Sequence, residues 1–180
     1  MTAFKIMPFD GSMKVNDEVQ KTSKELVPEV VASVELSALA KSSGDFVAHN
    51  FIHLEGVTIC SGAYPPVLMN EWNAWDKEHA SENETPAIFG DDQLFIVFAF
   101  ANGGQDLESF EFDNMEQAKS MLKQICVSLA VSEKVIAFEH RDLHWGNILL
   151  RHTSKPTLEY CLEGPQVNAS GNARRALQHH

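Results

Sequence analysis

Cysteine is scarce in this chain. The 180 residues include three, Cys60, Cys126 and Cys161, and none of them forms a Cys-x-x-Cys pair. Together with the lack of an apolar signal segment at Met1, this predicts a reduced intracellular compartment. The sequence also has no apolar run long enough to cross a bilayer, so no membrane partner is expected.

Basic residues are also few, with 14 Lys and Arg against 25 Asp and Glu and a formal net charge of −11. This balance argues against direct nucleic-acid binding, which needs a basic face. It suits a basic protein partner, which an acidic groove attracts. Five acidic residues follow one another closely and could line such a groove: Asp106, Glu108, Glu111, Asp113 and Glu116. All but Asp106 could equally form a solvated loop and helix start.

One motif in the sequence combines several polar residues at a defined spacing. His140-Arg141-Asp142 is followed by four residues, Asn147 and the apolar run 148–150. This spacing resembles the catalytic loop of protein kinases. The resemblance implies that Asp142 orients or deprotonates an attacking hydroxyl, while Asn147 reaches a Mg²⁺ ion on the nucleotide phosphates. The alternative, a buried turn whose polar groups satisfy the backbone, does not explain the spacing.

Two upstream segments match kinase elements in the same order. The strand-like run 2–6 resembles the kinase Val-Ala-Ile-Lys strand and would bring Lys5 to the α- and β-phosphates. A helix is expected over 28–36, beginning at Pro28 and showing an apolar face. That face consists of Val27, Val30, Val31 and Val34. Glu29 would pair with Lys5, although it could also be a first-turn acid favoured by the helix dipole.

The middle of the chain predicts a hinge between two lobes. The apolar run 94–100 reads as a buried strand. The main-chain groups of Ala101, Asn102 and Gly103 would bond adenine. Phe100, directly before them, would limit the pocket behind the adenine. Asp106 could face a ribose or a peptide substrate. A helix is expected over 115–138. Its apolar stripe would comprise Ala118, Met121, Leu122, Ile125, Leu129 and Ala130.

Further runs narrow the resemblance to the haspin kinases: 26–29, 62–66, 91–97, 103–108, 128–133 and 138–147. This family resemblance implies a serine/threonine kinase that uses ATP and Mg²⁺ and modifies a threonine near the amino terminus of histone H3. It also implies a chromosome-associated nuclear location, with the cytoplasm left open. The implied catalytic residues are Lys5, Glu29, Asp142 and His144. The implied nucleotide contacts are Lys5, Phe100, Ala101, Asn102, Gly103, Asp106 and Asn147, with Asn147 as the metal ligand.

Several kinase parts have no counterpart here. His144 stands where most protein kinases have a lysine; as a partly charged imidazole beside Asp142 it could still neutralise developing charge. No Asp follows Asp142, so the second magnesium ligand of the family, in an Asp-Tyr-Thr motif, is missing. Only four residues precede Lys5, which leaves no room for a glycine-rich loop. We expect very low or no turnover from these residues alone.

The predicted architecture is an incomplete α+β kinase-like fold. A partial small lobe would span 1–100, the hinge and a partial large lobe 101–163, and an irregular tail 164–180, with a strand expected over 157–162. Three functions remain open: a haspin-like protein kinase, a pseudokinase or nucleotide-binding scaffold, and a small-molecule kinase. The sequence predicts no oligomeric state.

Overall fold

The computed structural model describes residues 1–41, 45–153, 157–163, 166–170 and 173–177. The chain divides into two compact units. Unit 1 comprises Met1–Ala3, Glu29–Glu55 and the chain from Phe100 onward; unit 2 comprises Phe4–Pro28 and Gly56–Ala99. Helices and antiparallel strands occur side by side, which confirms the α+β class.

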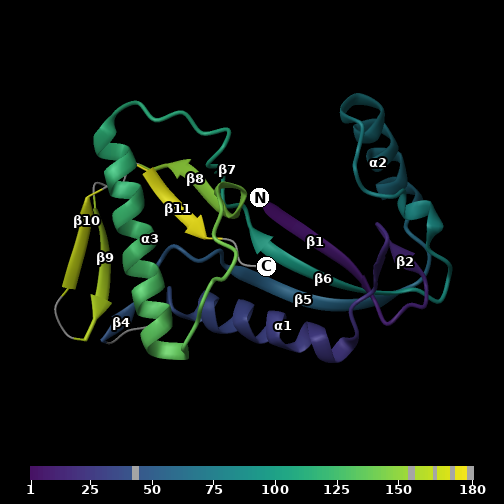
Figure 1. Cartoon of the computed structure of the whole chain (residues 1–180), viewed down its shortest axis with the longest axis horizontal. Helices are drawn as coiled ribbons and strands as arrows, with labels where there is room; N and C mark the ends of the chain where they lie inside the picture. Colours follow the sequence, from purple (N-terminus) through teal and green to yellow (C-terminus); the bar gives the residue numbers. More distant parts are fainter. Residues whose placement is uncertain (42–44, 154–156, 164–165, 171–172, 178–180) are drawn as a thin grey trace. The chain divides into compact units, whose positions relative to one another are not determined.

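Unit 2 is built largely on a sheet with the strand order β1-β6-β5. These strands are β1 (Thr2–Phe9), β6 (Leu94–Ala101) and β5 (Leu54–Ser61), and β6 is the expected apolar strand. A small hairpin joins β2 (Lys14–Val15) to β3 (Glu18–Val19) through Asn16 and Asp17, both at positive φ. Between β5 and β6 the chain forms α2 (Pro66–His79) and the short helix η1 (Pro86–Ile88), shown in Figure 1.

Helix α1 (Ser23–Ala38) begins five residues before the predicted start at Pro28, which lies inside it. The cause is a capping box at Thr22, which the sequence prediction missed. The Thr22 amide donates to Glu25 Oε2 at 2.7 Å, and the Glu25 amide donates back to Thr22 Oγ1 at 3.4 Å. Two satisfied end groups thus define the helix start upstream of the proline.

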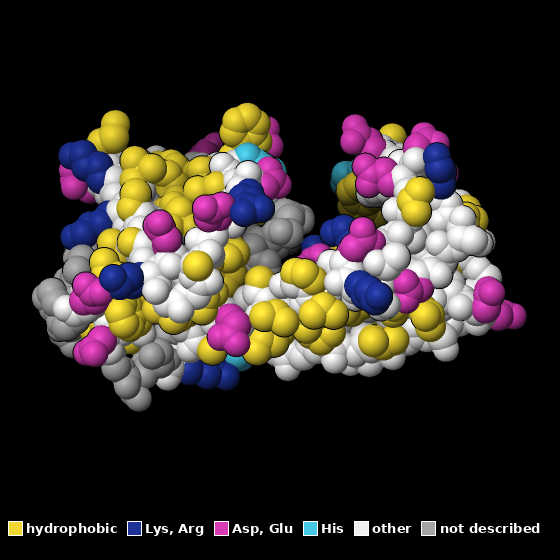
Figure 2. All heavy atoms as spheres, turned by 60° about the horizontal axis from the view of Figure 1, so that its bottom comes forward, with side chains coloured by type: hydrophobic (Ala, Val, Ile, Leu, Met, Phe, Trp, Pro, Cys, Tyr) yellow, Lys and Arg dark blue, Asp and Glu magenta, His cyan; other side chains and the backbone are white. Residues whose placement is uncertain are grey.

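The predicted valine face of α1 is largely not its buried face. Val27, Val31 and Val34 are 57%, 51% and 49% exposed, and hydrophobic side chains gather along this helix in Figure 2. The buried stripe follows helical spacing through Leu26, Ser33, Leu36 and Ser37. Ser33 Oγ donates to the Glu29 carbonyl and Ser37 Oγ bonds His53 Nδ1, so hydrogen bonds make these polar positions compatible with burial.

Unit 1 is organised around α3 (Met115–Ile136). Two sheets accompany it: β10-β9-β4, made of Gln166–Ser170, Thr157–Leu162 and Phe46–Val47, and β11-β8-β7, made of Ala173–Leu177, Ile148–His152 and Gln105–Asp106. The strand expected over 157–162 is therefore present as β9. The core between these elements includes Leu36, Phe51, Ile125, Leu150 and Tyr160.

The buried face of α3 is more polar than predicted. Leu122, assigned to the apolar stripe, is 58% exposed, whereas Gln124 and Ser128 are fully buried. Asn50 explains the difference, because its Nδ2 donates to Gln124 Oε1 at 3.0 Å and its Oδ1 accepts from Ser128 Oγ at 3.1 Å. The Tyr160 hydroxyl donates to the same oxygen. This Asn50 network joins α3 to β9 and to the segment after β4.

The structure differs from the predicted irregular tail over two five-residue segments. β10 pairs antiparallel with β9, with Val167 opposite Tyr160, and β11 pairs antiparallel with β8. Main-chain pairing alone defines these strands, and it requires no apolar period, which is why the sequence pattern did not reveal them. In the part of the chain that the structure describes, no helix is both long and apolar enough for a membrane span.

Candidate active site

The motif 138–150 forms a loop that leads from α3 into β8. α3 ends at Ile136, the C-cap Ala137 leaves the helix at a φ of 51°, and Arg141 at φ 59° turns the chain again before Asp142. The Phe138 ring packs edge-on against Phe51, with centroids 6.0 Å apart. The short helix η2 (Trp145–Asn147) then delivers the chain to β8. The loop is thus anchored at its start by the core and at its end by a strand.

Asp142 and Asn147 lie in direct contact. Asn147 is 2% exposed, and its Nδ2 donates to the Asp142 carbonyl at 2.8 Å and to Asp142 Oδ2 at 3.3 Å. The buried amide therefore holds the exposed carboxylate by both its main chain and its side chain. With Nδ2 so engaged, Asn147 Oδ1 is the atom that could ligate a cation.

His144 has a defined ring orientation. The Gly146 amide donates to His144 Nδ1 at 3.1 Å, and His144 Nε2 lies 3.8 Å from Asp142 Oδ2. Since an amide can only donate, Nδ1 must be the acceptor, and the neutral ring carries its proton on Nε2, toward Asp142. In this geometry the Nε2 proton of His144 lies on the side of the Asp142 carboxylate, at 3.8 Å between the heavy atoms, which is too long for a direct hydrogen bond.

Gly146 was missed by sequence reasoning as an orienting residue. A Cβ at this position would lie 2.9 Å from His144 Cε1 and 3.2 Å from Nδ1. The ring therefore occupies space that any other residue at 146 would take. A histidine two residues before a glycine in a tight turn is the only signal for this contact in the sequence.

The predicted hinge residues already share main-chain hydrogen bonds within unit 1. The Ala101 amide donates to the His53 carbonyl at 2.9 Å, and the Asn102 amide donates to the Met1 carbonyl at 3.1 Å. Adenine bound here would therefore have to use other groups, such as main-chain carbonyls or the amide of the buried Gly103. Phe100 is the second-last residue of β6, directly before this segment.

Asp106 is brought close to the catalytic loop. It pairs with Leu149 across β7 and β8, and the next amide, of Leu107, donates to the Ile148 carbonyl at 2.8 Å. The Ser109 amide donates to Asp106 Oδ1 at 2.7 Å, and this bond lowers the pKa of the Asp106 carboxyl. Asp106 is therefore a charged acid near the loop, with one oxygen engaged in its own turn.

Lys5 and Glu29 fall in different units. Lys5 is a half-buried residue of β1 in unit 2, and Glu29 lies in the part of α1 that belongs to unit 1. Their pairing stays a prediction. Asp142, His144, Asn147, Asp106 and the hinge, by contrast, all belong to unit 1.

Comparison with known proteins identifies the family of this chain. The family model described as the haspin-like kinase domain matches residues 1–168. The haspin homolog of Arabidopsis thaliana is 43% identical over 165 residues, covering 91% of this chain and 27% of the relative. The chain belongs to the haspin kinase family. Haspin of Bos taurus is 44% identical over 164 residues, covering 90% and 21%, and the Drosophila melanogaster homolog is 40% identical over 151 residues, covering 84% and 26%.

These haspin relatives are named serine/threonine-protein kinases, and the chain spans about a quarter of the length of those quoted. The family match covers the loop with Asp142 and Asn147 as well as the strand with Lys5. The predicted assignment to haspin is therefore confirmed, while the activity, substrate and location of a whole haspin are matters for proposal.

The residues present fit a haspin metal site in part. Asn147 supplies an amide oxygen, one of the hard ligands that Mg²⁺ prefers. Within the described ranges, no group of three or more His, Cys, Asp or Glu side chains could hold a metal ion. Asn147 Oδ1 would thus hold Mg²⁺ together with phosphate oxygens, and the bound ion would supply charge neutralisation on the nucleotide.

Proposed function

We propose that this chain is the catalytic-loop portion of a haspin-type serine/threonine protein kinase. The observation that carries the proposal is the buried Asn147 side chain bonded to Asp142 at both its carbonyl and its carboxylate, in a chain of the haspin family. A turn that only satisfied its own backbone would not need the second of these bonds. The proposed substrate is the basic amino-terminal tail of histone H3, and the proposed location is the nucleus, with the cytoplasm left open.

The proposed reaction transfers the γ-phosphoryl group of ATP to a threonine hydroxyl. The hydroxyl oxygen forms a bond to phosphorus as the bond to the β-phosphate oxygen breaks, and ADP leaves. Asp142 orients the hydroxyl and accepts its proton, because it is exposed and held in place from behind by Asn147. His144 Nε2 lies 3.8 Å from Asp142 Oδ2 and would present its proton to the charge that develops on this side of Asp142.

A scaffold or nucleotide-binding role is the second candidate. It is favoured because, in the described part of the chain, no group of three or more His, Cys, Asp or Glu side chains could hold a metal ion. Mg²⁺ without a second carboxylate is held more weakly, and positioning of the phosphates suffers with it. Under this reading the chain binds nucleotide without transferring phosphate.

Nucleotide binding and phosphate transfer should be measured on the same preparations. We expect the 180-residue chain to bind ATP more tightly with Mg²⁺ than without it, and Asn147→Ala to abolish this difference. Glu108→Gln, which changes an exposed residue of unit 1 outside the loop 138–150, is the control. A histone H3 tail peptide, incubated with a longer haspin chain containing these residues, should be phosphorylated, and Asp142→Asn should reduce the rate by about a thousandfold or more. Equal rates for Asp142→Asn and the unaltered chain would contradict the kinase proposal; binding without transfer would support the second candidate.

A further inference from the structure

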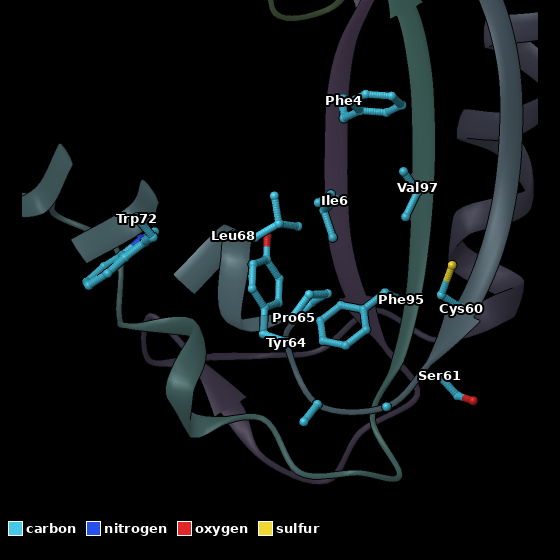
Figure 3. A pocket seen from close by; sticks show the side chains of 12 residues that line it. Phe4, Ile6, Cys60, Ser61, Tyr64, Pro65, Leu68, Trp72, Phe95 and Val97 are labelled. Atoms are coloured by element: carbon cyan, nitrogen blue, oxygen red, sulfur yellow. The ribbon is translucent and has the colours of Figure 1, made fainter. Parts of the chain in front are cut away.

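Unit 2 contains a pocket of about 660 Å³ that the kinase proposal does not use. Its floor is formed by side chains of β1 and β6, and α2 and the loop before it form the opposite wall, as Figure 3 shows. The volume falls in the range typical of ligand pockets in proteins. The lining includes Phe4, Ile6, Cys60, Tyr64, Leu68 and Phe95.

This pocket lies on the face of β1 away from Lys5. Phe4 and Ile6 both line it, and successive side chains of a strand point to opposite faces of the sheet. Lys5, between them, therefore points to the other face. A phosphate bound by Lys5 and a ligand in this pocket would occupy opposite sides of the same strand, so the pocket is a separate site.

The walls suit a flat apolar group. The Tyr64 ring packs edge-on against Phe95 at 5.8 Å between centroids, and Phe89 packs edge-on against Phe95 at 5.1 Å. Burial raises the pKa of the Tyr64 hydroxyl, which reflects how poorly solvated the wall is. None of the lining residues carries a charge at neutral pH. An aromatic side chain could therefore be desolvated here without leaving a buried charge unpaired.

The surroundings of the pocket are acidic. Glu71 lies on α2 one turn from the lining residue Leu68, and Asp91 and Asp92 precede Gln93, whose carbonyl accepts from the amide of the lining residue Gly62 at 3.0 Å. All three carboxylates are exposed. Across 56–99 there is one basic residue, Lys77, against seven acidic ones: Glu71, Asp76, Glu78, Glu82, Glu84, Asp91 and Asp92.

We propose that this pocket docks an aromatic side chain of a partner protein that carries Lys or Arg directly beside it. The aromatic ring enters between Ile6, Leu68 and Phe95, and the flanking cations face the carboxylates of Glu71 and Asp92. Neither step depends on nucleotide or on Asp142, so this proposal stands or falls separately from the kinase proposal.

Cys60 provides the readout, because it lines the pocket and is free and exposed, while Cys126 is free and exposed on α3 in unit 1. The alkylation rates of both thiols are measured by mass spectrometry with added pentapeptides of the sequence Gly-Lys-Trp-Lys-Gly. We expect protection of Cys60 but not of Cys126. Gly-Glu-Trp-Glu-Gly should require about a fivefold higher concentration for the same protection, since it meets like charges. Gly-Lys-Ala-Lys-Gly should not protect.

Two variants test the wall and the rim. Leu68→Asp should abolish protection, since it puts a charge into the apolar wall, whereas Leu122→Asp on α3 should leave it unchanged. Glu71→Lys should weaken protection by the Lys-Trp-Lys peptide about fivefold, and Glu82→Lys, with the same change in net charge beyond the end of α2, should not. Equal protection by the three peptides, or by free indole at the same concentration, would overturn the proposal, as would protection that survives Leu68→Asp.

Discussion

At the scale of single residues, the catalytic loop depends on atoms that hold functional groups in place. The Asn147 side chain donates a hydrogen bond to the Asp142 carboxylate, and the Gly146 amide orients the ring of His144 by donating to its Nδ1. The residue types were evident in the motif, and the spacing predicted Asp142 and Asn147 as a pair. The ring orientation was not predictable, because it depends on the direction of one amide in a short turn.

Gly146→Ala should displace the His144 ring, since the added Cβ would approach Cε1 to 2.9 Å. We expect the ¹⁵N chemical shifts of the His144 ring to move toward an average of the two neutral tautomers when the Nδ1 acceptor bond is lost. Gly56→Ala is the control, because a Cβ there meets nothing within 4 Å. Unchanged His144 shifts in Gly146→Ala would show that the amide bond does not set the tautomer.

The Asn50 network allows a second test at this scale. Tyr160→Phe removes one donor to Asn50 Oδ1 but leaves Ser128 in place, and should lower the free energy of unfolding of unit 1 by about 1 kcal/mol. Asn50→Ala also leaves Gln124, Ser128 and Tyr160 without this buried partner, and should cost about 3 kcal/mol. Urea denaturation followed by fluorescence measures both. Tyr64→Phe, outside this network, is the control; equal losses for Asn50→Ala and Tyr160→Phe would argue against a shared acceptor.

At the scale of elements, the positions of strands and helices along the sequence were easier to predict than which face of each helix is buried. The apolar run 94–100, the helix after residue 114 and the strand 157–162 all appear close to their expected bounds. Of the predicted α3 stripe, Met121 and Ile125 are buried, but the buried faces of α1 and α3 also contain serine and glutamine residues that the apolar stripes did not include. Such polar faces are stable only with partners such as Asn50 and His53, which lie elsewhere in the sequence.

The capping box of α1 gives a prediction for this element. Thr22→Ala should lower the free energy of unfolding by about 1 kcal/mol. The hydrogen bond from the Thr22 amide, followed by that from its hydroxyl, lowers the pKa of Glu25. A lowered folded-state pKa adds stability above the unfolded-state pKa and loses it as the pH falls through the folded-state pKa. Thermal unfolding between pH 7 and pH 3 should therefore show the Thr22→Ala deficit shrinking in acid. A deficit that stays constant over that range would contradict the coupling.

At the scale of the whole molecule, the formal charge of −11 and the sequence pI of about 5.1 dominate behaviour in solution. Binding of a basic peptide should weaken as salt rises from 50 to 500 mM, because the Debye length shortens from about 14 to about 4 Å. Solubility should be lowest close to pH 5, where the net charge vanishes. Peptide titrations at several salt concentrations and turbidity against pH check the two expectations. Salt-independent binding would show that the acidic surface has no part in attracting the peptide.

The hydrogen bonds from α3 to Asn50 have a consequence for how the catalytic loop keeps its place. A helix with a purely apolar buried face can shift by one turn, about 5.4 Å, along its axis and still form similar packing contacts. Slipping α3 would instead break the bonds of both Gln124 and Ser128 to Asn50 and leave these buried polar groups without that partner. The two hydrogen bonds to Asn50 therefore fix the position of α3 along its own axis. Because the catalytic loop follows directly after the end of α3, the same hydrogen bonds determine where Asp142 lies.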